Sequence, residues 1–427
     1  MWMLDIDFIR ENAEHIQRVA EQKGMEVEVE EVLRLDAERL TLLRTVEELR
    51  KRRNRASEEI ATLLRDRKGD AAEIRKESVR ELNIGLAAHE SKLAATAARF
   101  MQLMLLIPNV VSPDTPIGES DADNVEIKRA GDPPDFDFEP RDHVTLAQGL
   151  GLIDIARGVK VAGSRGYFLK NAGLHLHRAV QQLAIDLLSD RGFITMDVPM
   201  LAREESLLNT GFFPTGRDQT YHLPTDGKWL VGTSEVPLVS YYANEVIDVE
   251  RPICLAGVSN CFRREAGSAG RDVHGLYRVH QFAKVEQVVF CRNDLGTSLE
   301  LFEQITRNAE DILELLELPY RIVSVCTGDL SQKNYKQHDI ETWMPSRDGY
   351  GETHSSSILL EFQARRSNIR YRDRDGELRF CHTLNNTAVA TPRILIPLLE
   401  NHQRSDGSVH IPKALRRYMH GLLELTP

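Results

Sequence analysis

The first third of the chain repeats apolar positions three and four residues apart. From about Glu31 to Ile107 the only helix breakers are Gly69 and Gly85, and the composition favours helix. One heptad seam comprises Leu35, Arg39, Leu42, Val46, Leu49, Arg53, Ala56, Ile60 and Leu63. A second seam follows a polar break at residues 65–70 and comprises Val79, Leu82, Leu86, His89, Leu93, Thr96, Phe100, Leu103 and Ile107. The pattern predicts an N-terminal antiparallel coiled-coil hairpin.

The predicted hairpin is long and locally basic. At 1.5 Å per residue, each helix of about 35 residues reaches roughly 50 Å, so the hairpin should project into solvent as an arm. The chain has a net charge of -11, which argues against a protein that coats nucleic acid over its whole surface. We therefore expect local RNA contact on the arm, at Arg52, Arg53, Arg55, Arg65, Lys68 and Arg75. The alternative is that these charges only solvate a coiled-coil face.

A boundary follows the second heptad seam. Pro108, Pro113 and Pro116 interrupt a polar run, which is typical of a linker. We predict an N-terminal helical domain over residues 1–110, a linker over 111–125 and a second domain over 126–427.

The second domain mixes both kinds of periodicity. Helical patterns at about Ala172–Arg191 and Leu295–Leu316 alternate with short apolar runs such as Trp229–Val231. Because the regular rhythm of parallel β-α-β units is absent, we expect an antiparallel β-sheet flanked by helices. With the helical arm, this makes an α+β protein.

Composition narrows the class of protein. Hydrophobic residues make up 41% of the chain and charged residues 28%, which is typical of globular proteins. The chain has no apolar run of about 18 residues and no signal-peptide pattern at its start, so we expect a cytoplasmic protein that does not cross a membrane. Its five cysteines form no CxxC pair and no cysteine-histidine spacing of zinc type, so we expect reduced thiols and no zinc.

One predicted β-hairpin concentrates candidate chemistry. Its strands are expected at Ile253–Arg264 and Arg278–Phe290, and the period of two gives the second strand one polar and one apolar face. Phe282 and Glu286 share the polar face roughly 13 Å apart, which suits a base stacked at one end and an amino acid held at the other. Alternatively, this face is exposed and balanced by its own ion pairs.

The hairpin also resembles a known motif. The matching segments are Phe262–Ser268, Arg271–Asp272, Gly275–Arg278, His280–Phe282 and Lys284–Glu286. Together they resemble motif 2 of the class II aminoacyl-tRNA synthetases, and in detail that of the seryl-tRNA synthetases. Gly192–Pro199 resembles motif 1 and Thr383–Gln403 resembles motif 3, so the resemblance covers essentially the whole chain.

The resemblance implies a function. A chain of this family would be a homodimeric ligase that activates serine with ATP to seryl-adenylate. It would then transfer the seryl group to the 3′-terminal ribose of tRNA(Ser), which carries a long variable arm, and the family's range extends to tRNA(Sec). ATP and Mg²⁺ would be required.

The resemblance also implies site residues. The ATP site would comprise Arg263, Glu265, Arg278, Val279, Phe282, Glu352, Ser355 and Arg393. The serine site would comprise Thr233, Glu235, Arg263, Glu286 and Thr387. Glu352 and Ser355 would bind magnesium, and the residues most directly engaged in catalysis would be Arg263, Glu352 and Arg393. Arg263 would hold the α-phosphate and the serine carboxylate, where its planar fork suits oxyanions.

Some residues depart from the commoner family pattern. Ser356 and Ile358 stand where cysteine and asparagine are usual, and Asn385–Ala388 replaces a Gly-Ser-Gly form. Pro397 falls inside the predicted motif 3 helix, where proline normally breaks the hydrogen-bond ladder.

Three other functions compete with this one. A paralogue would activate serine for another acceptor, but it need not keep a basic arm. A non-catalytic regulator should have lost Arg263, Glu286, Glu352 or Arg393, and all four are present. A coiled-coil scaffold accounts for residues 31–107 alone.

Overall fold

The structure is a computed structural model that describes residues 4–267 and 275–427. Three residues of the motif 2 resemblance, Ser268, Arg271 and Asp272, lie outside the described residues. Within the described part of the chain, no helix is both long enough and apolar enough to cross a membrane.

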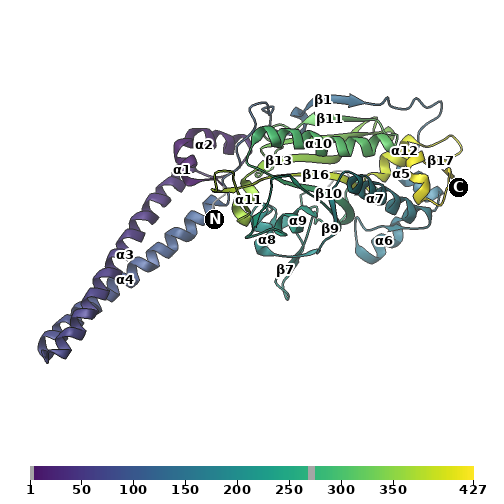
Figure 1. Cartoon of the computed structure of the whole chain (residues 1–427). Helices are drawn as coiled ribbons and strands as arrows, with labels where there is room; N and C mark the ends of the chain where they lie inside the picture. Colours follow the sequence, from purple (N-terminus) through teal and green to yellow (C-terminus); the bar gives the residue numbers. More distant parts are fainter. Residues whose placement is uncertain (1–3, 268–274) are drawn as a thin grey trace.

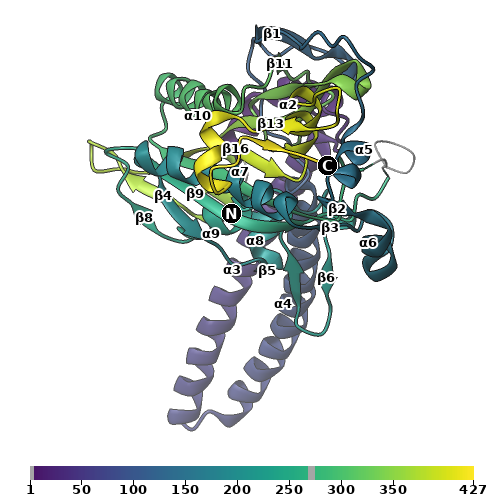
Figure 2. The same cartoon turned by 90° about the vertical axis from the view of Figure 1, so that its right-hand side faces the viewer.

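The predicted arm is present. Helices α3 (Val29–Arg65) and α4 (Gly69–Met104) form a hairpin that projects far from the rest of the molecule (Figure 1). Two short helices, α1 (Ile6–Glu11) and α2 (Ala13–Gln22), precede it and were not predicted. Figure 2 shows the same arm from a second direction, again clear of the body.

The arm is held by a narrow apolar seam and by ion pairs across it. Leu42, Val46 and Leu86 are buried between the helices. The arginine at seam position 39 is accommodated because its guanidinium pairs with Asp36 at 2.6 Å and lies over the Phe100 ring. Four ion pairs join α3 to α4: Glu31–Arg99, Glu38–Lys92, Arg50–Glu90 and Glu59–Arg75. Such exposed pairs add little stability but favour this register.

The body is built on the predicted antiparallel sheet. Its eight strands lie in the order β1 (Val125–Ala130), β11 (Tyr320–Ser324), β12 (Lys336–Met344), β13 (Gly349–Leu360), β16 (His382–Thr391), β10 (Gln281–Cys291), β9 (Ile253–Phe262) and β4 (Ile194–Asp197). Every neighbouring pair is antiparallel except β4 and β9, which are parallel. The long strands β10, β13 and β16 form the centre of the sheet and carry many of the candidate site residues.

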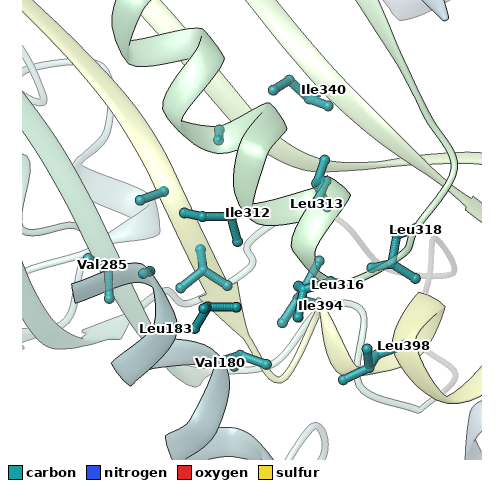
Figure 3. Close-up of a cluster of buried hydrophobic side chains, with 14 of the residues drawn as sticks. Val180, Leu183, Val285, Ile312, Leu313, Leu316, Leu318, Ile340, Ile394 and Leu398 are labelled. Carbon is teal, nitrogen blue, oxygen red and sulfur yellow. The ribbon is translucent and has the colours of Figure 1, made fainter. Parts of the chain in front are cut away.

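Two long helices cover one face of the sheet. They are α7 (Ala172–Asp190) and α10 (Leu295–Leu315), close to their predicted bounds. Their apolar sides pack with the sheet into the main core, in which Figure 3 shows Val180 of α7, Ile312 of α10 and Val285 of β10 converging. Each fully buried aliphatic side chain of this kind contributes about 1.5–3 kcal/mol through removal from water.

Shorter elements complete the body. The helices are α5 (His143–Gly149), α6 (Ile155–Ala162), α8 (Glu204–Asn209), α9 (Glu235–Ser240), α11 (Phe362–Ser367) and α12 (Leu395–Asn401). The short strands are β2 (Ile153–Asp154), β3 (Phe168–Leu169), β5 (Leu201–Arg203), β6 (His222–Leu223), β7 (Lys228–Leu230), β8 (Val246–Ile247), β14 (Arg370–Arg372), β15 (Leu378–Phe380), β17 (Val409–His410) and β18 (Glu424–Leu425).

The base of the arm is anchored to the body. A separate apolar cluster joins Ile16 of α2, Phe100 of α4 and Phe362 of α11. The proline-containing segment after α4 also follows the body, because Asn109 and Ser112 donate backbone hydrogen bonds to Gln332 and Tyr335. The domain limits 1–110, 111–125 and 126–427 stay a prediction, but the segment between the helices and the sheet is a packed connection.

Candidate active site

The hairpin of β9 and β10 carries the candidate chemistry, with one correction to its bounds. Strand β10 begins at Gln281, so Arg278 precedes the strand and its position follows from the loop, not from strand alternation. Phe282 and Glu286 do lie within β10, opposite Cys261 and Gly257 of β9. The alternative of an exposed charged face is wrong, because Lys284 and Glu286 are only 5% and 2% exposed.

A cavity opens beside this hairpin. Its lining includes seven of the eight residues predicted for ATP, namely Arg263, Glu265, Arg278, Val279, Phe282, Glu352 and Arg393. Thr387, predicted for serine, also lines it. Ser355, Thr233, Glu235 and Glu286 are not among its lining residues. Segments far apart in the sequence are thus brought together by β10, β13 and β16.

One end of the cavity pairs an arginine with an aromatic ring. The Arg263 guanidinium lies 5.1 Å from the centre of the Phe282 ring, and its Nε donates to the Gly232 carbonyl. This arrangement leaves a flat apolar ring beside a fixed positive charge, which suits a base and its α-phosphate.

Glu265 has an unusual backbone. Its φ of +52° lies in the left-handed region, which non-glycine residues seldom adopt, and such conformations cluster at functional sites. Its carboxylate is 3.2 Å from Arg278 and 3.6 Å from Arg165. Arg165 was missed because it lies about 100 residues away in a segment without a motif.

Arg393 lines the same cavity. Its guanidinium lies 4.5 Å from the Tyr277 ring centre and 3.3 Å from the Glu352 carboxylate. Arg393 lies two residues before Leu395, the first residue of α12. The guanidinium of Arg347 lies 4.0 Å from the centre of the same ring. The two arginines concentrate positive charge beside Tyr277, as an outer-phosphate site requires.

A β-bulge brings the two predicted magnesium ligands to one face. Positions three apart on a regular strand point to opposite faces, but the register of β13 against β12 shifts at Thr353. Glu352 and Ser355 consequently both interact with the buried Asp339, whose pKa is raised well above its usual range by burial and then by the Glu352 charge. The donors at this position are hard oxygens, which fit Mg²⁺. Asp339 was missed because it lies on the neighbouring strand.

A second bulge shapes the predicted serine site. The register of β16 against β10 shifts at Ala388, so Thr387 stands opposite Glu286 and donates to its carboxylate at 3.3 Å. Glu286 also pairs with Lys284 at 2.7 Å. Burial raises the pKa of the Glu286 carboxyl, while Lys284 and Thr387 oppose the shift.

Glu235 begins α9 and is buried beside this pair. Its Oε1 accepts from Lys333 at 2.5 Å and from Gln363 at 2.7 Å, and its backbone N–H donates to Thr233. Burial lowers the pKa of the Lys333 ammonium, and Glu235 opposes that shift. Lys333 and Gln363 were missed, since neither lies in a segment with a recognised motif.

Of the departures from the commoner pattern, Ser356, Ile358 and Asn386 lie outside this pocket, whereas Thr387 is part of it. Asn386 donates to the Ser356 hydroxyl at 2.6 Å and accepts from Gln287, in a buried network that continues to Thr306 of α10. The sheet separates this network from Thr387 and Glu286, which point to the other face. Ile358 is fully buried in the main core.

Pro397 is also explained. Helix α12 begins at Leu395, so Pro397 is its third residue. The first turn of a helix has no intrahelical acceptors for its N–H groups, and a missing N–H there breaks no ladder bond.

The predicted tRNA-contact residues lie along the distal arm. Arg52, Arg55, Arg65 and Lys68 are exposed, whereas Arg53 and Arg75 are half-buried. Arg75 pairs with Glu59 at 2.5 Å, so part of its charge serves the hairpin itself.

Comparison with known proteins agrees with this geometry. Residues 3–111 match the family model of the seryl-tRNA synthetase N-terminal domain, and residues 222–402 match that of the class II tRNA synthetase core domain (G, H, P, S and T). The chain is 44% identical over 421 residues to a serine–tRNA ligase of Deinococcus radiodurans and 43% identical over 419 residues to one of Rubrobacter xylanophilus, with 98% of each chain covered in both cases.

A solved structure agrees as well. Seryl-tRNA synthetase of Pyrococcus horikoshii, crystallised with ATP, superimposes with a TM-score of 0.89 at 38% identity and with 99% of each chain covered. Fold, site and similarity over the full length lead to one conclusion: the chain belongs to the seryl-tRNA synthetase family of class II aminoacyl-tRNA synthetases.

Proposed function

We propose that this chain is a serine–tRNA ligase that makes seryl-adenylate from serine and ATP and passes the seryl group to the 3′-terminal ribose of tRNA(Ser). The observation that carries the proposal is the joining of two sites. A cavity lined by arginines and an aromatic ring adjoins the buried carboxylate of Glu286. This carboxylate already accepts a hydrogen bond from the Thr387 hydroxyl. A nucleotide and a small hydroxy amino acid would therefore lie side by side.

Serine would be held at its three polar groups. Its hydroxyl would bind Glu286 and Thr387, its ammonium group Glu235 and its carboxylate Arg263. A buried carboxylate without a partner costs about 1–3 kcal/mol, so alanine, which lacks the hydroxyl, is disfavoured. The packed walls around Glu286 oppose the additional methyl group of threonine, although one methyl group gives only limited discrimination.

Activation would need positioning and charge stabilisation more than a protein nucleophile. In this proposal Phe282 stacks on the adenine, Glu265 accepts from its amino group and Val279 forms an apolar wall. The serine carboxylate then attacks the α-phosphorus in line and pyrophosphate leaves. Arg263 neutralises the charge that grows at the α-phosphate, and Arg278 and Arg393 neutralise that of the leaving group.

Mg²⁺ would be held by Glu352 and Ser355 on the bulged part of β13. When bound, it supplies Lewis-acid charge that stabilises phosphate oxygens. Arg393 would move from Glu352 to the phosphates when ATP enters, since a phosphate is the stronger partner for its guanidinium.

Changing Glu352 to glutamine should raise the Mg²⁺ concentration for half-maximal pyrophosphate exchange about tenfold, because an amide oxygen replaces a charged ligand. A Mg²⁺ titration of serine-dependent exchange measures this. The matched control is Glu341→Gln, since Glu341 lies opposite Glu352 but binds Arg321 at 2.6 Å. Equal Mg²⁺ dependence of wild type and Glu352→Gln would contradict the assignment.

The second step would use the arm. We propose that its basic distal part binds the long variable arm of tRNA(Ser), and that of tRNA(Sec) where the cell makes it. We also propose a homodimer formed around β4, an edge strand of the main sheet, and the nearby β5, because Ile194 of β4 and Leu201 of β5 are more than half exposed. A cytoplasmic location stays a prediction.

One assay tests the proposed function. ATP–pyrophosphate exchange is measured with each amino acid in turn, and charging of purified tRNA follows. Exchange with serine and charging of tRNA(Ser) are expected. Exchange with no amino acid would contradict the enzyme, and exchange without charging would favour a paralogue with another acceptor.

A further inference from the structure

The N-terminal helices and the connection after α4, residues 4–112, are called the N-terminal helical unit. This unit forms hydrogen bonds with one segment of the body, residues 331–335. Lys23, the residue that follows α2, is buried, and its ammonium donates to the carbonyl oxygens of Ser331, Gln332 and Asn334 at 3.3, 3.4 and 2.6 Å. Five further hydrogen bonds join the segment to the connection after α4.

The connection after α4 also binds carbonyl groups of the segment. Asn109 donates from its backbone to the Gln332 carbonyl and from its side chain to the Lys333 carbonyl, and the Ser112 N–H donates to that of Tyr335. The side chain of Gln332 returns hydrogen bonds to Leu105 and Ile107. Each carbonyl from 331 to 335 is thus bound by the N-terminal unit, which fixes the backbone of this segment.

The side chain of Lys333 reaches Glu235 of the predicted serine site. Its ammonium lies 2.5 Å from Glu235 Oε1 and 4.0 Å from the centre of the Phe212 ring, and its side chain is 11% exposed. Gln363 binds the same oxygen at 2.7 Å. Among the described residues both of these donors bind Oε1, which makes Oε2 the oxygen that can receive the serine ammonium group.

The charges explain why a lysine is suited to this position. Glu235 and Glu286 are both buried, and each has its own lysine, Lys333 and Lys284 respectively. A buried carboxylate is stable in its charged form only when it is paired and hydrogen-bonded. Lys333 therefore pairs with the buried Glu235 carboxylate and fixes its orientation before serine arrives.

We infer that Lys333 is a positioning residue for serine, and that the N-terminal helical unit sets its position through Lys23 and Asn109. The inference rests on the proposed function, since it takes Glu235 as the ligand of the serine ammonium group. The base of the arm would thus contribute to amino-acid binding, whereas the distal arm would contact tRNA.

The test is a double-mutant cycle in the full-length chain, read by ATP–pyrophosphate exchange. Lys333→Met should raise the KM for serine about tenfold with the KM for ATP within about twofold of wild type, because one charge-assisted hydrogen bond to the ligand Glu235 is lost. Lys23→Met should raise the KM for serine in the same selective way but less. The double variant should be no worse than Lys333→Met alone, because both changes act through one contact.

The matched control is Lys336→Met. Lys336 lies three residues further on and joins Asp114 at the same junction, but its side chain does not contact Glu235. It should leave both KM values unchanged. Thermal unfolding of each variant checks the fold, and Asn109→Ala replaces Lys23→Met in the cycle if the latter fails to fold.

The outcomes separate the two hypotheses. Unchanged KM for serine in Lys333→Met, an equal rise in the KM for ATP, or multiplying effects in the double variant would each overturn the inference while leaving the enzyme intact. Absence of serine-dependent exchange in the wild type would instead contradict the proposed function.

Discussion

Replacing Arg263 with alanine is expected to lower kcat/KM for serine-dependent pyrophosphate exchange about 1000-fold. In the proposed complex this guanidinium meets both reactants, the α-phosphate of ATP and the carboxylate of serine. Loss of one preorganised donor to a developing oxyanion typically costs a factor of about 100 to 1000, and here ground-state binding of serine is lost as well. Steady-state exchange with serine and ATP varied in turn measures the effect.

Arg264 provides the matched control for this prediction. It is the next residue, it is exposed, and its backbone N–H donates to the Gln219 carbonyl. Arg264→Ala should retain exchange within about twofold, because surface substitutions away from a site have small effects. Arg263→Lys should recover little, since an ammonium cannot make the paired contacts of the guanidinium fork. A loss of less than tenfold in Arg263→Ala would remove Arg263 from the centre of the reaction.

Shortening the arm is expected to separate the two steps of the reaction. Deletion of residues 43–63 and 71–91 together takes three heptads from each helix and keeps the native turn at 64–70. The arm would become about 30 Å shorter at 1.5 Å per residue, with its seam still in register. Charging of tRNA(Ser) should fall a hundredfold or more, roughly what loss of several phosphate contacts costs. Serine-dependent exchange should stay within about twofold.

The limits of this deletion follow from the structure. Removal of the whole segment 31–107 would also remove Phe100 and Met104 from the apolar cluster at the arm base, and Ile107 from its contact with Gln332. The shorter deletion leaves these residues and Lys23 in place. Undiminished charging of tRNA(Ser) by the shortened chain would contradict the proposal that the distal arm binds tRNA. An equal loss of exchange and charging would contradict the proposal that exchange does not need the distal arm. In the full-length chain, added salt should weaken charging more than exchange.

The sequence was sufficient for the arm and for most of the predicted ATP-site residues that line the candidate cavity. Heptad spacing depends on local residues alone, so α3 and α4 could be placed within a few residues. Phe282 and Glu286 could be placed on one face because β10 has no bulge against β9 between them.

Other features depended on contacts that no local pattern encodes. A bulge is visible only when the partner strand is known, so the common orientation of Glu352 and Ser355 could not be derived from their spacing. The pairing of Glu235 with Lys333 joins residues 98 positions apart. Arg278 was assigned to a strand because apolar alternation continues through Val279, although pairing with β9 begins only at Gln281.

Asn386 and Ser356 both depart from the commoner family pattern, and they are hydrogen-bonded to each other. Each residue therefore depends on the presence of the other. If only one partner were exchanged for an apolar residue, the other would be left buried with an unmet hydrogen-bonding group, at a cost of about 1–3 kcal/mol. A chimera that takes motif 3 from a relative with a Gly-Ser-Gly form would therefore have to take the matching residue of β13 with it. Across the family the two positions would be inherited as a pair, although one lies in motif 3 and the other 30 residues before it.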